Sequence, residues 1–162
     1  MTKILTGPAK RRGKGAERPS ATLKQLSALT FDLHTKQPRL DLGPQGIRIL
    51  KELIAAANAG LWVSVVILAA TLVDVCLHEA GQFDRLSGSD DGADEVFGLS
   101  NLTATERRRL DSLRARRNAL VHYEGSVAGV SGSVDDEATL AVAAEQALEA
   151  ILPVLENLER WG

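Results

Sequence analysis

Apolar residues recur at helical spacing over most of the chain, and every long element that this spacing predicts is a helix. Local signals mark where three helices begin: Ser20 is a typical helix cap, Pro44 suits a first helical turn, and Thr103 with Glu106 forms a capping box. We therefore predict an all-α protein. The predicted helical segments run from Ser20 through Leu29, from Pro44 to about Ala57, from Leu61 to about Phe83, from Thr103 through His122 and from about Asp135 through Leu158.

The most apolar stretch, residues 54–73, carries no charge over 20 residues, which meets the length of a membrane span. This stretch is rich in alanine, contains several polar residues, and runs directly into Asp74 and His78. A helix that is apolar on all sides also fits the centre of a bundle or a subunit interface. We therefore predict that the chain does not cross a membrane.

Composition fits one globular domain of ordinary size. The chain has 162 residues, of which 44% are hydrophobic and 25% are charged. The single cysteine, Cys76, lies in an apolar run and cannot form an internal disulfide. The basic N-terminus is not followed by the apolar segment of a signal peptide. These features predict a cytoplasmic protein with a buried thiol.

Charge divides the chain into a basic start and an acidic remainder. Residues 1–24 hold seven of the 19 lysines and arginines but only one of the 21 acidic residues. We predict a flexible basic arm over residues 1–19 and a single helical domain over residues 20–162. Such an arm often contacts nucleic acid, and deleting it would then weaken RNA binding and its salt dependence; a solvated tail is the equal alternative.

Two stretches rich in small and polar residues are predicted to be loops. The first, residues 85–100, contains several carboxylates, but their order does not follow the ligand pattern of a calcium-binding loop. We therefore predict a solvated loop there, no bound metal and no cofactor. Residues 124–134, rich in glycine and serine, are predicted to form a flexible loop before the last helix.

The segment 116–123 is the part of the chain that indicates chemistry. At about 100° per residue, Arg117 lies near the centre of an apolar stripe on its helix. A guanidinium on a buried face needs a carboxylate, a second subunit or a phosphate as partner, because leaving it unpaired costs a large desolvation energy. Asn118 and His122, four residues apart, lie on the flank of the stripe. The other members of the stripe are Leu110, Leu113, Leu120 and Val121.

An arginine followed directly by Asn118, with four residues between Arg117 and His122, resembles the motif of the HEPN superfamily. The hallmark of that superfamily is an Arg-x4-6-His motif near the end of a helix, in a bundle of four to five helices. The resemblance covers roughly residues 44–160 as an arrangement of helices. It implies an up-and-down bundle in which the motif helices of two protomers meet, so that a homodimer forms a composite site for RNA cleavage.

The resemblance also implies roles for individual residues. Arg117, Asn118 and His122 match the catalytic positions, and Asp74 matches an acidic residue that many members hold near the arginine. Arg114 and Tyr123 are further candidates to support the site. In the subgroup paired with nucleotidyltransferase antitoxins a tyrosine lies two places after the histidine, and this chain departs from that pattern because its tyrosine follows the histidine directly. A nuclease of this kind is expected in a toxin–antitoxin, stress or phage-defence setting, with an antitoxin or operon partner.

The residue types favour the same chemistry without the resemblance. Cleavage of RNA without a metal needs a group that titrates near neutrality, such as histidine, and a fixed positive charge for the phosphorane, such as arginine. Two other interpretations stay open: His122 can interact only with the helix dipole, and Arg117 can form a buried structural ion pair with Asp74. Two other functions also stay open: a non-catalytic helical dimer with a regulatory or scaffolding role, similar to the mannitol-repressor-like regulators, and a nucleotide-binding module.

Overall fold

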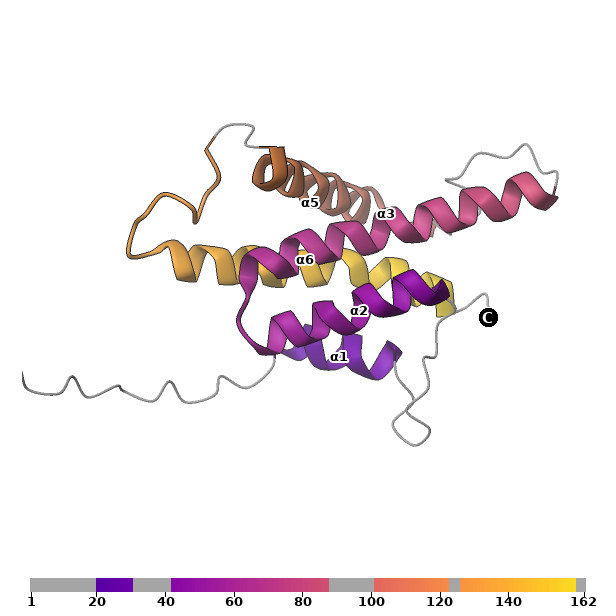
Figure 1. Cartoon of the computed structure of the whole chain (residues 1–162), viewed down its shortest axis with the longest axis horizontal. Helices are drawn as coiled ribbons and strands as arrows, with labels where there is room; N and C mark the ends of the chain where they lie inside the picture. Colours follow the sequence, from indigo (N-terminus) through magenta and orange to yellow (C-terminus); the bar gives the residue numbers. More distant parts are fainter. Residues whose placement is uncertain (1–19, 31–41, 88–100, 123–125, 160–162) are drawn as a thin grey trace, which may run out of the picture.

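The computed structural model describes residues 20–30, 42–87, 101–122 and 126–159, and within these ranges it contains five α-helices and no strand (Figure 1). The prediction of an all-α chain is confirmed, and the helices begin and end close to the predicted residues. The basic arm and residues 88–100 of the predicted acidic loop lie outside the described residues. Residues 85–87 were predicted as the start of that loop, but they are the last residues of the third helix, which is four residues longer than predicted. The helices are α1 (Ala21–Thr30), α2 (Gly43–Asn58), α3 (Trp62–Ser87), α5 (Ala104–His122) and α6 (Asp136–Glu159).

Side-chain caps fix the starts of α1 and α5 as the sequence predicted. The backbone N–H of Leu23 donates to the hydroxyl of Ser20 at 3.0 Å. At the start of α5, the backbone N–H of Thr103 donates to the Glu106 carboxylate at 2.6 Å, and the N–H of Glu106 donates back to the Thr103 hydroxyl at 3.2 Å. These reciprocal bonds satisfy donors that a helix start leaves open. The Thr103 N–H, with its hydroxyl, also holds the pKa of Glu106 below its usual range.

A tight turn at residues 59–61 divides the charge-free run into two helices. Gly60 has φ 69°, a left-handed conformation that glycine adopts without a steric cost. The N–H of Leu61 donates to the carbonyl of Ala56 at 2.9 Å, so the end of α2 remains hydrogen-bonded. α2 and α3 then lie side by side in opposite directions (Figure 1). Residues 54–73 therefore do not form one continuous span.

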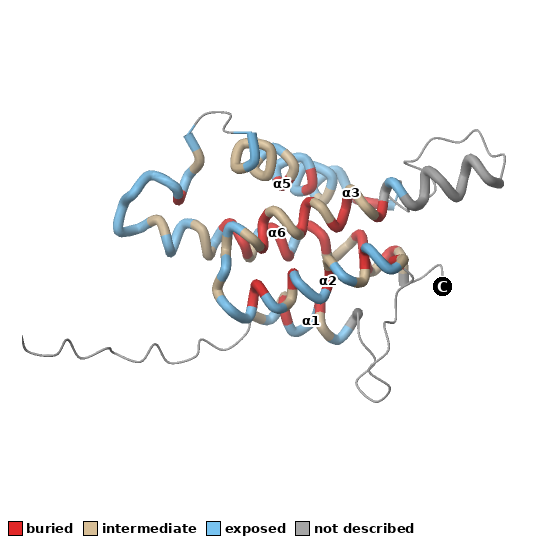
Figure 2. The backbone as a smooth tube through the Cα atoms, in the orientation of Figure 1, coloured by how far each residue is buried: buried red, intermediate tan, exposed pale blue. Residues whose placement is uncertain are grey.

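Two helices, α3 and α6, form the centre of the bundle (Figure 2). α3 contacts α2, α5 and α6, and α6 contacts α1, α3 and α5. Burial of branched side chains from these helices and from α1 and α2 stabilises the fold, at about 25 cal/mol for each Å² of apolar surface removed from water. Cys76 is buried here, as predicted. The largest fully buried side chains are Leu26, Leu50, Leu53, Leu72, Ile151 and Leu155.

Among the described residues, α6 is the helix whose length and composition would allow it to cross a membrane, over Asp136–Leu158. Core helices of globular domains have the same length and composition, and α6 contacts three other helices. Its buried residues include Ala144, Leu148 and Ile151. The prediction that the chain does not cross a membrane is therefore unchanged and stays a prediction.

The described part of the glycine- and serine-rich loop, residues 126–135, forms hydrogen-bonded turns, which differs from the flexible loop predicted. Asp136, the first residue of α6, organises it. Its carboxylate accepts hydrogen bonds from the N–H of Ser131 at 2.8 Å, of Gly132 at 2.7 Å and of Ser133 at 3.1 Å, and from the Ser131 hydroxyl at 2.8 Å. Gly132 has φ 83°, which favours glycine at this position. One carboxylate thus satisfies several backbone donors before the helix begins.

We expect Asp136→Asn to lower the melting temperature at neutral pH and to have little effect in acid. Partial burial raises the pKa of Asp136, but hydrogen bonds from Ser131, Gly132 and Ser133 outweigh this and hold the pKa below the usual 3.8. A carboxylate with a lowered pKa stabilises the fold above its unfolded-state pKa, and this contribution is lost as pH falls through the folded-state pKa. Thermal unfolding at pH 7 and in acid below the lowered folded-state pKa of Asp136 measures both effects.

The matched control for this prediction is Asp135→Asn. This change removes the same charge one residue earlier, and the Asp135 carboxylate accepts no hydrogen bond from any described residue. An equal loss of melting temperature in the two variants would mean that charge near the helix start, and not the hydrogen bonds of Asp136, stabilises the loop.

Candidate functional site

The candidate site lies where α3 and α5 pack against each other, and Asp74 on α3 is at its centre. One carboxylate oxygen, Oδ1, is 3.4 Å from Nε of Arg114, and the other, Oδ2, is 3.6 Å from Nη2 of Arg117. Two arginines one helical turn apart on α5 therefore share one acid from the neighbouring helix. The family resemblance led us to expect Asp74 near Arg117, and the structure brings the two side chains together.

The shortest contact of Arg117 is with Asn118. Nη1 of Arg117 donates to Oδ1 of Asn118 at 2.8 Å, which is a well-formed hydrogen bond, whereas the contacts with Asp74 are longer. Because a guanidinium can only donate, the oxygen of the Asn118 amide must face it. The amide nitrogen is then directed away, and it donates to no described residue. Asn118 therefore offers two further N–H donors beside the positive charge.

Arg117 is less buried than the apolar stripe predicted. Leu110 and Leu113, earlier on α5, are buried, but the Arg117 side chain is 30% exposed and that of Asp74 is 42% exposed. The alternative interpretation of Arg117 is therefore correct in its partner and wrong in its burial: Arg117 does pair with Asp74, but the pair is partly exposed to water. Solvent screens such a pair, so Arg117→Ala should cost only about 1 kcal/mol or less through the lost ion pair.

The exposure of Val121 also differs from the prediction of a buried apolar stripe. It lies on the same side of α5 as Leu110 and Arg117, yet it is 50% exposed. α5 extends to His122, and the described residues cover only about half of the Val121 side chain in this last turn. Val63, near the start of α3, is also exposed. The last turn of α5 thus presents an apolar side chain directly beside the candidate histidine.

His122 is the last residue of α5, and its side chain is exposed, in agreement with the predicted flank position. It forms no hydrogen bond with the described residues. On a straight helix, His122 projects about 140° away from Arg117. One copy of the chain therefore does not aim the histidine and the guanidinium at a common point. Tyr123, the remaining candidate, lies outside the described residues.

Within the described part of the chain, no group of three or more His, Cys, Asp and Glu side chains is arranged to hold a metal ion. The groups gathered at the site are instead two guanidiniums, one carboxylate and one amide. Arginine and amide N–H groups are donors suited to phosphate oxygens. The arrangement can therefore bind an anion at the surface between α3 and α5.

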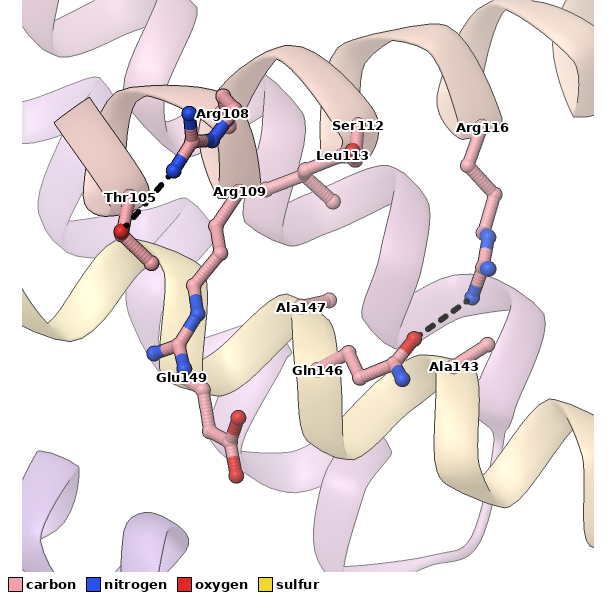
Figure 3. Close-up of a pocket in the computed structure, with 10 residues that line it drawn as sticks. All are labelled: Thr105, Arg108, Arg109, Ser112, Leu113, Arg116, Ala143, Gln146, Ala147 and Glu149. Carbon is pink, nitrogen blue, oxygen red and sulfur yellow. Dashed lines mark hydrogen bonds between the residues drawn. The ribbon is translucent and has the colours of Figure 1, made fainter.

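A groove lined by arginines, between α5 and α6, was not predicted from the sequence. Arg108, Arg109 and Arg116 lie along this groove of about 470 Å³ (Figure 3), although the spacing along α5 indicates no partner helix for them. The sequence holds only part of the signal: Ala143 and Ala147 on α6 are small and four residues apart, but their spacing does not show which residues of α5 they face. Small side chains on one helix leave space under long side chains on the next.

Comparison of the chain with protein-family models, with curated proteins and with solved structures gives no match.

Proposed function

We propose that the chain is a HEPN-like, metal-independent endoribonuclease that acts as a homodimer in the cytoplasm. The observation that carries this proposal is the arrangement around Arg117: Asp74 and Asn118 hold its guanidinium, which is still 30% exposed. An exposed histidine, His122, follows on the same helix. A fixed cation open to water, with free amide donors beside it, is suited to a phosphodiester.

Each residue has a defined role in the proposed reaction. His122 accepts the proton of the ribose 2′-hydroxyl, whose oxygen attacks the adjacent phosphorus. Arg117 and the Asn118 amide donate hydrogen bonds to the phosphorane oxygens, where negative charge develops. The bond from phosphorus to the 5′-oxygen then breaks, that oxygen takes up a proton from water, and the protonated His122 returns its proton to the solvent. The products are a 2′,3′-cyclic phosphate and a 5′-hydroxyl.

A dimer is part of the proposal because of the directions of Arg117 and His122. Since the two side chains project about 140° apart, one copy cannot easily bring both to a single phosphate. Two α5 helices that face each other can contribute the arginine of one copy and the histidine of the other. Val121, exposed in the last turn of α5, supports an interface at this position, since an apolar side chain there gains from being covered.

The test is cleavage by the purified wild-type chain, with its oligomeric state measured in parallel. We expect sedimentation at micromolar concentration to give a dimer, and incubation with single-stranded and structured RNA in EDTA to give fragments ending in a 2′,3′-cyclic phosphate. EDTA matters because the proposed reaction uses no metal ion. A dimer that cuts none of these RNAs would remove the nuclease, and a monomer would remove the composite site.

A second candidate function is a non-catalytic dimer with a regulatory or scaffolding role. One observation favours it: no described residue orients His122, whereas catalytic histidines are commonly held by a hydrogen bond. The Asp74, Arg114 and Arg117 cluster would then serve to join α3 to α5. This function predicts a dimer without cleavage, and substitution of His122 would leave its properties unchanged. The toxin–antitoxin or defence setting belongs only to the nuclease.

A further inference from the structure

The groove between α5 and α6 is lined by three arginines and one glutamate (Figure 3). Arg108, Arg109 and Arg116 come from α5, and Glu149 comes from α6. The formal charge of this lining is therefore strongly positive. Its floor is apolar: Leu113, Ala143 and Ala147 are buried, and they offer no polar atom to the arginines above them.

The guanidiniums around the groove have only weak partners. Nη1 of Arg116 reaches across to Oε1 of Gln146 on α6 at 3.5 Å, and Nη2 of Arg108 donates to the Thr105 hydroxyl at 3.2 Å. Arg109 extends towards α6 beside Glu149 but forms no hydrogen bond or ion pair with a described residue. Most N–H donors of the three side chains are thus available to an anion.

The shape of the groove favours a compact ligand over a polymer that runs through it. Arg116 and Gln146 meet across one end, and Arg109 reaches over towards α6 further along (Figure 3). A terminal phosphate carries about −1.5 to −2 charges near neutral pH, which matches three arginines and one glutamate better than the single charge of a phosphodiester. We propose that this groove binds a small molecule through a terminal phosphate or pyrophosphate group.

This site is separate from the proposed nuclease site. On α5, Arg116 projects about 100° from Arg117 and about 120° from His122, so the groove opens on the α6 side of the helix. Asp74 and its partners lie on the α3 side. Binding to the groove can therefore be measured without RNA, and its result does not depend on whether the chain cuts RNA.

The test is calorimetric titration of the full-length chain with inorganic pyrophosphate at low ionic strength. We expect Arg109→Gln and Arg116→Gln each to weaken binding roughly 10- to 100-fold, the effect of losing a charged hydrogen-bonding group. Gln146→Glu should weaken binding as well, because it places a carboxylate of nearly the same size against Arg116. Pyrophosphate should raise the melting temperature of the wild type and not of these variants.

Arg107→Gln is the matched control. It removes the same charge from an exposed position on the same helix, but Arg107 does not line the groove. An equal loss of affinity in this variant would mean that pyrophosphate responds only to overall charge, and the proposal would be wrong. A short single-stranded DNA with hydroxyl groups at both ends tests whether phosphodiesters also bind, and it lacks the 2′-hydroxyl that the proposed nuclease would need to cut it. If it binds as tightly as pyrophosphate and loses affinity in the same groove variants, the groove accepts phosphodiesters, and the terminal phosphate is not what it recognises.

Discussion

His122→Ala is expected to lower the rate of RNA cleavage by about 10²- to 10⁴-fold, the usual contribution of a side chain that moves a proton in the transition state. The melting temperature should stay close to that of the wild type, because His122 is exposed at the end of α5 and forms no hydrogen bond with the described residues. A small decrease is expected from its position, since a charged histidine interacts favourably with the C-terminus of a helix. Rates and unfolding curves measured on the same preparations separate these effects.

His122→Gln is the chemical control for this prediction. Glutamine keeps a polar side chain at the position but cannot take up a proton near neutral pH. It should therefore be as inactive as the alanine variant, and added imidazole should restore part of the activity of His122→Ala. If His122→Gln retained the wild-type rate, the side chain would act by hydrogen bonding alone, and the proposed proton transfer would be wrong.

Val121→Asp is expected to convert the dimer to a monomer and to remove cleavage with it. Val121 is half exposed in one copy of the chain, and it lies in the turn that the proposal places at the interface. A carboxylate buried without a partner at such a contact costs several kcal/mol, which is enough to dissociate a dimer at micromolar concentration. Because the side chain is not part of the core, the fold should survive. Sedimentation and circular dichroism measure the two outcomes.

Val134→Asp provides the comparison for the interface. It introduces the same side chain at another exposed valine, which is 97% exposed and lies in the loop before α6. This variant should remain dimeric and active. If Val121→Asp also remained dimeric, the interface would lie on a different face, and the last turn of α5 could not be the place where two sites meet.

The helices could be predicted from the sequence because the signals that define them are local. The capping residues Ser20 and Thr103, and the glycine in the turn between α2 and α3, act within a few residues of themselves. The loop before α6 shows the limit of composition. Its glycines and serines predicted flexibility, but Asp136 satisfies its backbone donors and forms turns. The ordered turns thus depend on one side chain, Asp136, and not on the overall glycine and serine content of the loop.

The candidate site could be predicted only in part. The motif indicated Arg117, Asn118 and His122, and the resemblance added Asp74, which the structure places within 3.6 Å of Arg117. The burial of the stripe on α5 was predicted less well, because spacing along one helix does not show how much of its length the neighbouring helices cover. Val121 follows the apolar stripe, but the described residues cover only about half of its side chain.

The arginine-lined groove could not be predicted for a related reason. It exists because Arg109 and Arg116 on α5 lie opposite Ala143 and Ala147 on α6. That pairing depends on the register between two helices that lie about 30 residues apart in the chain, as the contact of Arg116 with Gln146 shows. Periodicity within one helix carries no information about this register.

The most direct test of the composite site is to mix two inactive variants, His122→Ala and Arg117→Gln, under conditions in which dimers exchange subunits. Each homodimer should be inactive, because one lacks the proton carrier and the other lacks the charge that stabilises the phosphorane. In a mixed dimer, the arginine of one copy and the histidine of the other complete one site. The mixture should then recover about a quarter of the wild-type activity, since random exchange makes about half of the dimers mixed and each has one intact site of two. A mixture that stays inactive although mixed dimers are present would contradict a site shared between two copies.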